Sequence, residues 1–266
     1  KLMVLDLASG QSSEVKVTIP GDRPKIKERS VSPGSLTSGG TISPTGKRVV
    51  LEARGDLFSL PAKEGVTRNL TRTDGFAERD PAWSPDGRWI AYFSDEGGEY
   101  DLYVRPADSR PAPDPKAKKD EPQPIPSAWS DDAPRKLTDL GPGFRYTPTW
   151  SPDSKHIVFH DQNGHMFLTT VESGETKEFD KDPWMNGPGF SWSHDSNWIT
   201  YARADEANAN GCIWIYNVKS GEKNQVTSNM FDSGTPAFDR KRDWLFFNSK
   251  RSVTSPRYSD IDATFV

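Results

Sequence analysis

Two arginines stand out as residues that could bind a charged ligand. Arg79 and Arg145 each lie a few residues before a Pro-x-Trp-Ser-Pro-Asp segment, at nearly equivalent places in two copies of a repeat. A guanidinium at such a place could bind a peptide carboxylate through paired hydrogen bonds. The alternative is a surface arginine that pairs with Glu78 or a neighbouring aspartate. We therefore treat Arg79 and Arg145 as candidates for contact with a peptide.

The side chains needed for nucleophilic catalysis do not occur in a recognisable pattern. The segment Gly189–Ser193 comes nearest to a nucleophile elbow, but it lacks the second glycine. His194 takes the proline position of a turn, and Cys212, the single cysteine, begins an apolar strand. A cysteine in that place is typical of a small buried hydrophobic residue. We predict no catalytic residue in this chain.

Metal and cofactor sites are not expected either. His156, His160 and His165 are the residues to consider. On a strand, the first two lie roughly 13 Å apart at about 3.3 Å per residue, so they could not share an ion without a partner strand. The turn at 161–164 has its glycine in the wrong position for a calcium loop. A glycine-rich phosphate loop is also absent from the sequence.

Charge and hydropathy exclude two classes of partner. The chain of 266 residues has 34 basic and 38 acidic side chains and a net charge of -4. This balance argues against nucleic acid as a partner. No stretch approaches 18 consecutive apolar residues, so we expect no membrane span. Apolar residues make up only 33%, but nine Trp and thirteen Phe supply large buried surfaces.

A segment of the type Trp-Ser-Pro-Asp-Gly recurs and marks an internal repeat. Its spacings of 41, 67, 42 and 46 residues give a unit of roughly 42 residues once an insertion of about 26 is set aside. Proline followed by Asp-Gly suits a tight turn. We call these segments the anchors, and there are five: Ile42–Lys47, Trp83–Arg88, Trp150–Lys155, Trp192–Asn197 and the degenerate Phe238–Asp243.

Each anchor is followed by short apolar runs that are typical of strands. One run, such as Trp89–Phe93, follows the anchor directly, and a second, such as Asp101–Val104, follows a polar turn. Both are rich in aromatic and β-branched residues. We predict an all-β fold, a β-propeller of four-stranded blades with about five blades in this chain. A two-sheet sandwich is the alternative, but it does not explain why the anchors recur in register.

We interpret residues 1–266 as a single propeller domain interrupted by one loop. Eight prolines fall within residues 106–134, and we predict a flexible Pro-rich insertion at 109–134. Residues 3–11 align with 214–222, so the chain begins in the third strand of a blade. The last blade, begun by Trp244–Asn248, has no such strand. We expect Leu2–Leu7 to complete it and to close the ring.

Residues 43–62 and 69–95 resemble the second propeller of tricorn-type serine proteases, and so does the closing segment Pro256–Asp262. The likeness runs over nearly the whole chain except the insertion. The anchor itself also occurs in Tol-system propellers and in prolyl-oligopeptidase-type peptidases. In tricorn-type enzymes, the resemblance implies, two propellers precede a PDZ-like module and a serine peptidase core. None of that core has positions in this chain.

The resemblance implies a non-catalytic propeller that scaffolds and gates peptide access to a peptidase core. Its partners would be peptide substrates in transit, the other domains of the parent protease and further copies in a homo-oligomer. We expect a cytoplasmic location, with a periplasmic or secreted one as the alternative. A free-standing Tol-system-like propeller that binds a protein is the rival function. A lactonase-like propeller would need acidic residues converging on calcium, and the repeat has no such residues.

Overall fold

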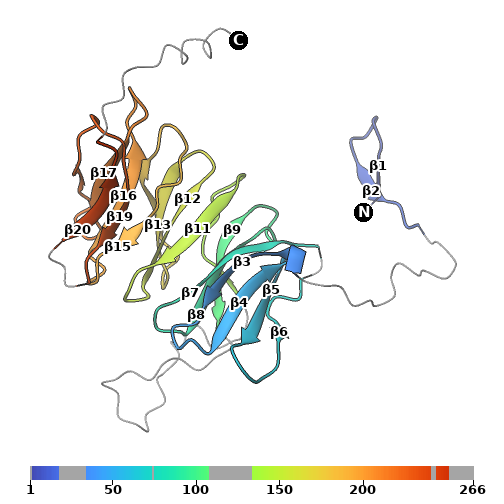
Figure 1. The fold of residues 1–266 in the computed structure, drawn as a ribbon. Coiled ribbons are helices and arrows are strands. Elements are labelled where there is room, and N and C mark those ends of the chain that lie inside the picture. The colour runs from blue at the N-terminus through green and yellow to red at the C-terminus, as the bar shows by residue number, and fades with distance from the viewer. Residues whose placement is uncertain (1, 18–33, 74, 108–133, 241–243, 252–266) are drawn as a thin grey trace. The chain divides into compact units, whose positions relative to one another are not determined.

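A computed structural model describes residues 2–17, 34–73, 75–107, 134–240 and 244–251 (Figure 1). The chain separates into two units, Lys1–Ser35 and Leu36–Val266, which we describe one at a time. Nearly all of the predicted insertion at 109–134 lies outside the described residues, as does Pro256–Asp262. The prediction of a flexible loop therefore remains a prediction.

The larger unit consists of antiparallel sheets that follow one another along the chain. Four of them have four strands and one has two, and we call them blades 1 to 5 in chain order. The strands are β3 (Thr37–Ile42), β4 (Arg48–Ala53), β5 (Asp56–Pro61) and β6 (Arg68–Asn69) in blade 1; β7 (Glu78–Trp83), β8 (Trp89–Ser94), β9 (Asp101–Pro106) and β10 (Arg135–Lys136) in blade 2; β11 (Arg145–Trp150), β12 (His156–Asp161), β13 (His165–Thr170) and β14 (Thr176–Lys181) in blade 3; β15 (Ser191–Trp192), β16 (Trp198–Ala204), β17 (Gly211–Asn217) and β18 (Lys223–Gln225) in blade 4; and β19 (Ser233–Phe238) and β20 (Leu245–Ser249) in blade 5.

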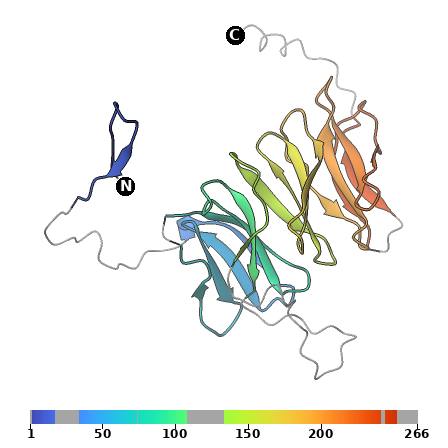
Figure 2. The same ribbon diagram turned by 180° about the vertical axis from the view of Figure 1, so that it is seen from behind.

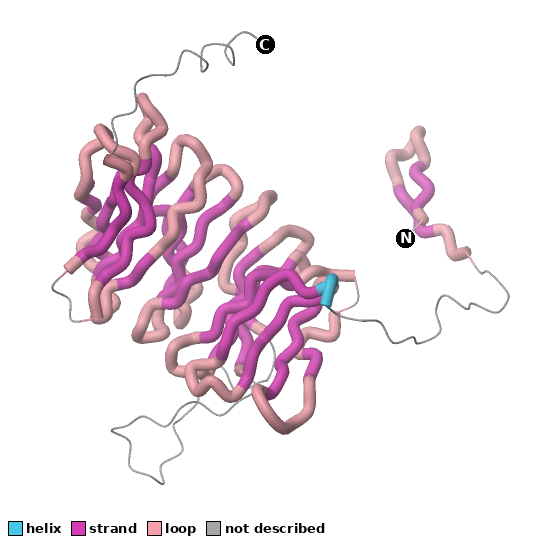
Figure 3. Tube along the Cα trace, viewed as in Figure 1, coloured by secondary structure: helices cyan, strands magenta, loops and turns pink. Residues whose placement is uncertain are grey.

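This arrangement confirms the predicted fold class, with about five blades of the propeller type. The sheets lie side by side in chain order in both views (Figures 1 and 2). The first strands of neighbouring blades contact one another, as β3 and β7 do, and β7 and β11. Figure 3 shows strands joined by loops, and in the described part of the chain the helix is a single short turn, η1 (Gly34–Leu36). Among the described residues, no helix has the length and apolarity of a membrane span.

The hydrophobic core lies between the blades. All six residues of β8 are buried, and successive side chains serve different neighbours. Ile90 and Tyr92 pack with Val50 of blade 1, whereas Ala91 and Phe93 pack with residues of blade 3 such as Ile157. A third cluster, which includes Val158, Met166 and Tyr201, joins blades 3 and 4. Blades 2 and 3 therefore bury apolar side chains on both faces, as the strand alternation requires.

The anchors form the turns between the first and second strands, and a serine organises each turn. In blade 2 the Ser84 N–H donates to the Trp89 carbonyl at 2.8 Å. The Trp89 N–H donates to Ser84 Oγ at 2.9 Å, and that hydroxyl donates to Asp86. Ser151 and Ser193 make the same set of bonds in blades 3 and 4. The Ser-Pro-Asp pattern thus satisfies backbone groups at the strand ends.

The anchors also hold neighbouring blades together. Ser154 and Ser196 have left-handed φ angles of 61° and 60°, where glycine is the easier residue. Their hydroxyls accept hydrogen bonds from the backbone N–H groups of Asp86 and Asp153 in the preceding blade, both at 3.1 Å. In the same seams the indoles of Trp150 and Trp192 donate to backbone carbonyls of the preceding blade at 3.0 and 3.3 Å.

The smaller unit contains one hairpin, in which β1 (Met3–Leu5) pairs with β2 (Ser12–Glu14). Its turn has the hydrogen bonds of the third-to-fourth-strand hairpin in blade 4. Asp6 N–H donates to Gln11 at 2.9 Å, as Asn217 N–H does to Glu222 at 2.8 Å. Within the described residues β1 pairs with β2, and β20 with β19. The two units are described separately, so the predicted pairing of Leu2–Leu7 with the last blade remains a prediction. A third strand forms its local hairpin readily because the loop to be closed is short.

Gly164 tests how tightly a hairpin tip packs against the connection that leaves its own blade after β14. Asp182 N–H donates to the Gly164 carbonyl at 2.9 Å. Gly164 has φ +82°, and a Cβ there would lie 2.4 Å from the Asp182 carbonyl oxygen. We expect Gly164→Ala to lower the free energy of unfolding by about 3 kcal/mol, because strain and a backbone clash add.

Gly189→Ala is the matched control for this substitution. Gly189 has φ +59° with open space around its Cβ position, so only the backbone strain of about 1 kcal/mol applies. Urea unfolding followed by tryptophan fluorescence measures both variants. Equal losses in the two would show that the close approach at Gly164 does not matter.

Candidate functional site

The candidate residues lie on one face of the larger unit, where the chain enters the first strand of each blade. The hairpins between second and third strands, such as Arg54–Gly55, lie at the same end. We call this end the connection face. On it, the Glu78 N–H donates to the Gly55 carbonyl at 2.7 Å, which ties the connection into blade 2 to the hairpin of blade 1. Sites on this face are therefore built from two neighbouring blades.

Arg79 is exposed on the connection face at the start of β7. Its guanidinium carbon lies 5.5 Å from the centre of the Tyr100 ring, a cation–π distance. Among the described residues Arg79 makes no ion pair. The alternative that Arg79 pairs with Glu78 or an adjacent aspartate is therefore not what the structure contains.

Arg145 has a different environment, because its side chain is buried, with 6% exposed. Its guanidinium donates to the carbonyls of Gly141 at 2.7 Å and Gly143 at 2.8 Å, and also to the carbonyl of Tyr100. These bonds hold the connection into blade 3 against the hairpin of blade 2. Arg145 thus stabilises the backbone on this face, and its donors point into the protein.

The two arginines do not occupy equivalent positions, which corrects the sequence interpretation. Arg145 pairs with Asp161, the last residue of its second strand, and the residue that pairs with the last residue of β8 is Glu78. Arg145 therefore matches the buried Glu78, and Tyr146 matches the exposed Arg79. The two arginines are offset by one residue, and one residue along a strand moves a side chain to the opposite face.

Tyr100, which sequence reasoning did not single out, connects the two arginines. Its ring lies beneath Arg79 and its carbonyl accepts from Arg145. The ring also stacks on Phe144, with centroids 5.3 Å apart. Partial burial raises the pKa of the Tyr100 phenol, so the ring stays neutral beneath the cation. The position directly before the third strand was the available signal, but tyrosine there has no motif to mark it.

A cavity of about 420 Å³ opens beside Arg79 between blades 1 and 2. Glu52 is fixed in its wall: one carboxylate oxygen accepts from the Ser38 hydroxyl at 2.6 Å. The other accepts from the Asp80 N–H at 3.1 Å. Asp80 has a left-handed φ of 51° at a bulge in β7, and this bulge directs its N–H toward Glu52. The residues that line the cavity are Leu36, Ser38, Glu52, Arg54, Gly55, Phe76, Ala77 and Arg79.

Aromatic side chains extend the connection face beyond this cavity. Phe76 is 42% exposed, Phe144 44% and Tyr146 38%. Tyr146 lies against His160, with ring centroids 5.3 Å apart, and burial lowers the pKa of that histidine. The face therefore combines arginine with exposed aromatic rings, a combination suited to peptide side chains and carboxylates.

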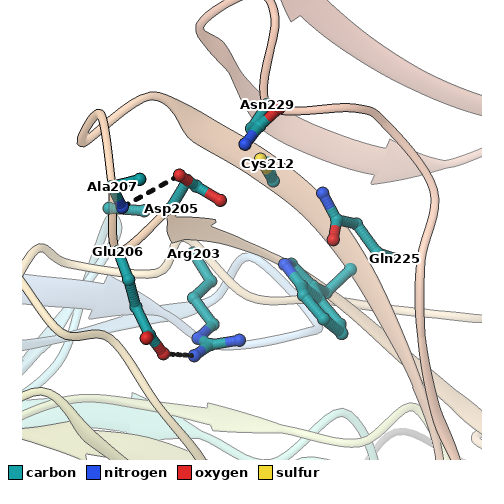
Figure 4. A pocket seen from close by; sticks show the side chains of 9 residues that line it. Arg203, Asp205, Glu206, Ala207, Cys212, Gln225 and Asn229 are labelled. Carbon is teal, nitrogen blue, oxygen red and sulfur yellow. Dashed lines mark hydrogen bonds and ion pairs between the residues drawn. The ribbon is translucent and has the colours of Figure 1, made fainter.

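A second cavity of about 270 Å³ lies in blade 4 (Figure 4). The arginine of this cavity, Arg203, already has partners within the protein. It donates to Glu206 at 3.2 Å and to the Lys181 carbonyl at 2.8 Å. Its guanidinium carbon also lies 5.2 Å from the centre of the Trp214 ring. Cys212 lines this cavity but is buried, in agreement with the sequence interpretation. Burial raises the pKa of its thiol, which opposes thiolate formation.

The remaining candidates from the sequence are placed in the strands and turns expected for them. His194 is exposed in the anchor turn of blade 4. His156 and His160 lie in β12, and His165 lies in β13. In the part of the chain that the structure describes, no group of three His, Cys, Asp or Glu side chains is placed to hold a metal ion.

Two curated relatives cover this chain in part or in full. The uncharacterized peptidase YuxL of Bacillus subtilis is 30% identical over 176 residues, which are 66% of this chain and 22% of that protein. Tricorn protease homolog 1 of Streptomyces coelicolor is 23% identical over 265 residues, 98% of this chain and 23% of that protein. The chain thus spans less than a quarter of the length of these relatives. No protein-family model matches it.

Solved structures match the same fold. The crystal structure of the tricorn protease matches 96% of this chain and 23% of its own, with a TM-score of 0.67 and 14% identity. A protein described as TolB from Agrobacterium tumefaciens matches 81% of this chain and 70% of its own, with a TM-score of 0.53 and 20% identity. The chain therefore has the β-propeller fold, and its sequence is similar to part of proteins that are described as peptidases. The resemblance to tricorn-type and Tol-system propellers is confirmed.

The different roles of the two arginines in this propeller predict different effects on stability. We expect Arg145→Met to lower the free energy of unfolding by about 3 kcal/mol, because buried carbonyls lose a charged donor. Arg79→Gln should cost less than about 1 kcal/mol, since it removes one exposed cation–π contact. Urea unfolding of both variants checks this. Similar losses for the two would contradict the assignment of Arg145 as the structural arginine.

Glu78 predicts a pH dependence of propeller stability. Its side chain is fully buried and accepts from Thr73 at 2.6 Å, and among the described residues its Oε2 has no hydrogen-bond partner. Burial raises the pKa of this carboxyl. Protonated Glu78 contributes its full share of stability at a pH below the ordinary pKa of glutamate. This contribution is lost as the pH rises through the raised pKa of Glu78 in the folded protein.

The side chain introduced by Glu78→Gln does not titrate. The urea midpoint of this variant, relative to that of the wild type, should therefore increase as the pH rises from about 4 to about 8. Midpoints in urea at three pH values measure this gain, with the exposed Glu64→Gln as control. A Glu78→Gln curve parallel to the wild type across this range would refute the assignment.

Proposed function

We propose that this chain is a non-catalytic propeller that scaffolds a peptidase and gates the access of peptides to it. The similarity to peptidases over less than a quarter of their length supports this proposal, because it leaves room for a peptidase core elsewhere in such proteins. In this proposal the partners are peptide substrates in transit, the other domains of a parent protease and further copies of the chain. The compartment we propose is the cytoplasm.

The observation that carries the proposal is the composition of the connection face. Exposed aromatic rings of Phe76, Phe144 and Tyr146 lie on the same face as Arg79 and its cavity. Aromatic rings bind varied apolar side chains, and arginine binds carboxylates, so the face suits peptides of mixed sequence. A gating surface needs weak and tolerant contacts of this kind, since a tightly bound peptide would block passage.

A protein-binding module of the Tol-system type is the alternative. It is favoured by one finding, which is that the match with TolB covers 70% of that chain, against 23% for the tricorn protease. In that case the connection face would bind a folded partner, and short unstructured peptides would bind no better than unrelated small molecules. Peptide binding therefore discriminates between the two functions.

We expect the purified chain to bind short peptides weakly and to hydrolyse none of them. Binding of a fluorescein-labelled hexapeptide library, followed by fluorescence anisotropy, should give dissociation constants on the order of 0.1–1 mM, a range typical of small contact areas. Fluorogenic peptides test hydrolysis. Peptidase turnover that persists through repeated purification would overturn the non-catalytic role. Failure of every peptide to bind would overturn the gating role.

A further inference from the structure

We propose that the cavity beside Arg79 is a carboxylate site, formed by Arg54 and Arg79, that selects peptides by a negatively charged group. This inference rests on the proposed function, because it names the feature of the peptide that is recognised. Both arginines line the same cavity of about 420 Å³, Arg54 from the hairpin of blade 1 and Arg79 from β7 of blade 2. Both side chains are exposed, and among the described residues neither makes an ion pair.

The backbone at Arg54 supports a role for its side chain. Arg54 and Gly55 form a two-residue hairpin between β4 and β5, with φ angles of 58° and 88°. Hairpins with two positive φ angles favour asparagine, aspartate or glycine at the first of these positions. Arginine there is the more strained choice, and strain of this kind concentrates at functional sites.

Glu52 sets the charge that the cavity can accept. Both of its oxygens are engaged, by Ser38 and by the Asp80 N–H, so it is held in the cavity wall. Two guanidinium groups and one carboxylate leave a single positive charge, which suits one carboxylate better than a phosphate dianion. Since Arg79 lies over the neutral Tyr100 ring, its charge remains available to a ligand.

Phe76 adds an apolar requirement next to this charge. Its ring lines the same cavity and is 42% exposed. A peptide that places a carboxylate between the arginines brings its neighbouring side chain toward this ring. The ligand class is therefore a peptide with a carboxylate beside an apolar side chain, and that carboxylate is either the C-terminal group or an Asp or Glu side chain.

Three labelled peptides test the proposal with the full 266-residue chain. All are hexapeptides of uncharged residues with an N-terminal dansyl group, a label without a carboxylate: one ends in leucine with a free carboxylate, one is its C-terminal amide, and one is the amide with aspartate before the leucine. Fluorescence anisotropy gives the dissociation constants. We expect the free carboxylate or the aspartate peptide to bind at least fivefold more tightly than the neutral amide. Which of the two does so identifies the source of the carboxylate.

Variants of the chain assign the effect to the cavity. Arg54→Asn removes the charge and suits the left-handed backbone, so it should fold at least as well as the wild type. It and Arg79→Gln should each abolish the preference over the amide. Arg240→Gln is the matched control, an exposed arginine in the anchor turn at the opposite end of its strand. Thermal melts confirm that the variants are folded.

The outcomes separate this inference from the proposed function. Equal binding of all three peptides, unchanged in Arg54→Asn and Arg79→Gln, would overturn the carboxylate site and leave peptide gating intact. Competition by inorganic phosphate more effective than by acetate would also overturn it, because the site would then prefer a phosphate. No binding of any peptide would overturn both.

Discussion

Blades 2 and 3 of this protein need a neighbour on each face, and the rest of the structure depends on that requirement. In β8 all six residues are buried, and alternate side chains enter two different clusters. A four-stranded sheet with two apolar faces cannot be stable in water by itself. Packing blade against blade buries both faces and places the first strands of neighbouring blades in contact. The repeated apolar strands therefore require an arrangement in which blade packs against blade.

The polar groups then determine how closely the blades approach. On the anchor side, serine hydroxyls accept hydrogen bonds from the preceding blade. Tryptophan indoles donate hydrogen bonds to the same blade. On the connection face, backbone hydrogen bonds such as that from the Glu78 N–H to the Gly55 carbonyl also join neighbouring blades. Because this last bond crosses the seam between blades 1 and 2, the cavity beside Arg79 is lined by both of these blades. In this way Arg54 of the blade 1 hairpin and Arg79 of β7 line the same cavity.

Much of this organisation could be predicted from the sequence. The anchors, the apolar runs after them and the number of blades depend on local turn chemistry and strand alternation, which are visible in the residues. The position of Arg79 on an exposed face was also predictable. Arg79 and Arg145 were placed at nearly equivalent positions, and the strand pairing shows that they are offset by one residue, as counting back from Trp83 and Trp150 also does. The hairpin of Met3–Leu5 with Ser12–Glu14 is a local pairing, and the predicted pairing of the N-terminal strand with the last blade stays a prediction.

By itself, then, the sequence determined the repeat, the strand order and the absence of a recognisable catalytic motif, because each of these is encoded within about forty residues. Only the tertiary structure decided which arginine is buried and which is free to bind. That difference depends on Tyr100, whose carbonyl is bound by Arg145 and whose ring lies beneath Arg79. Contacts across a seam join residues from separate repeats, and their distances follow from how the blades pack, which no local pattern records.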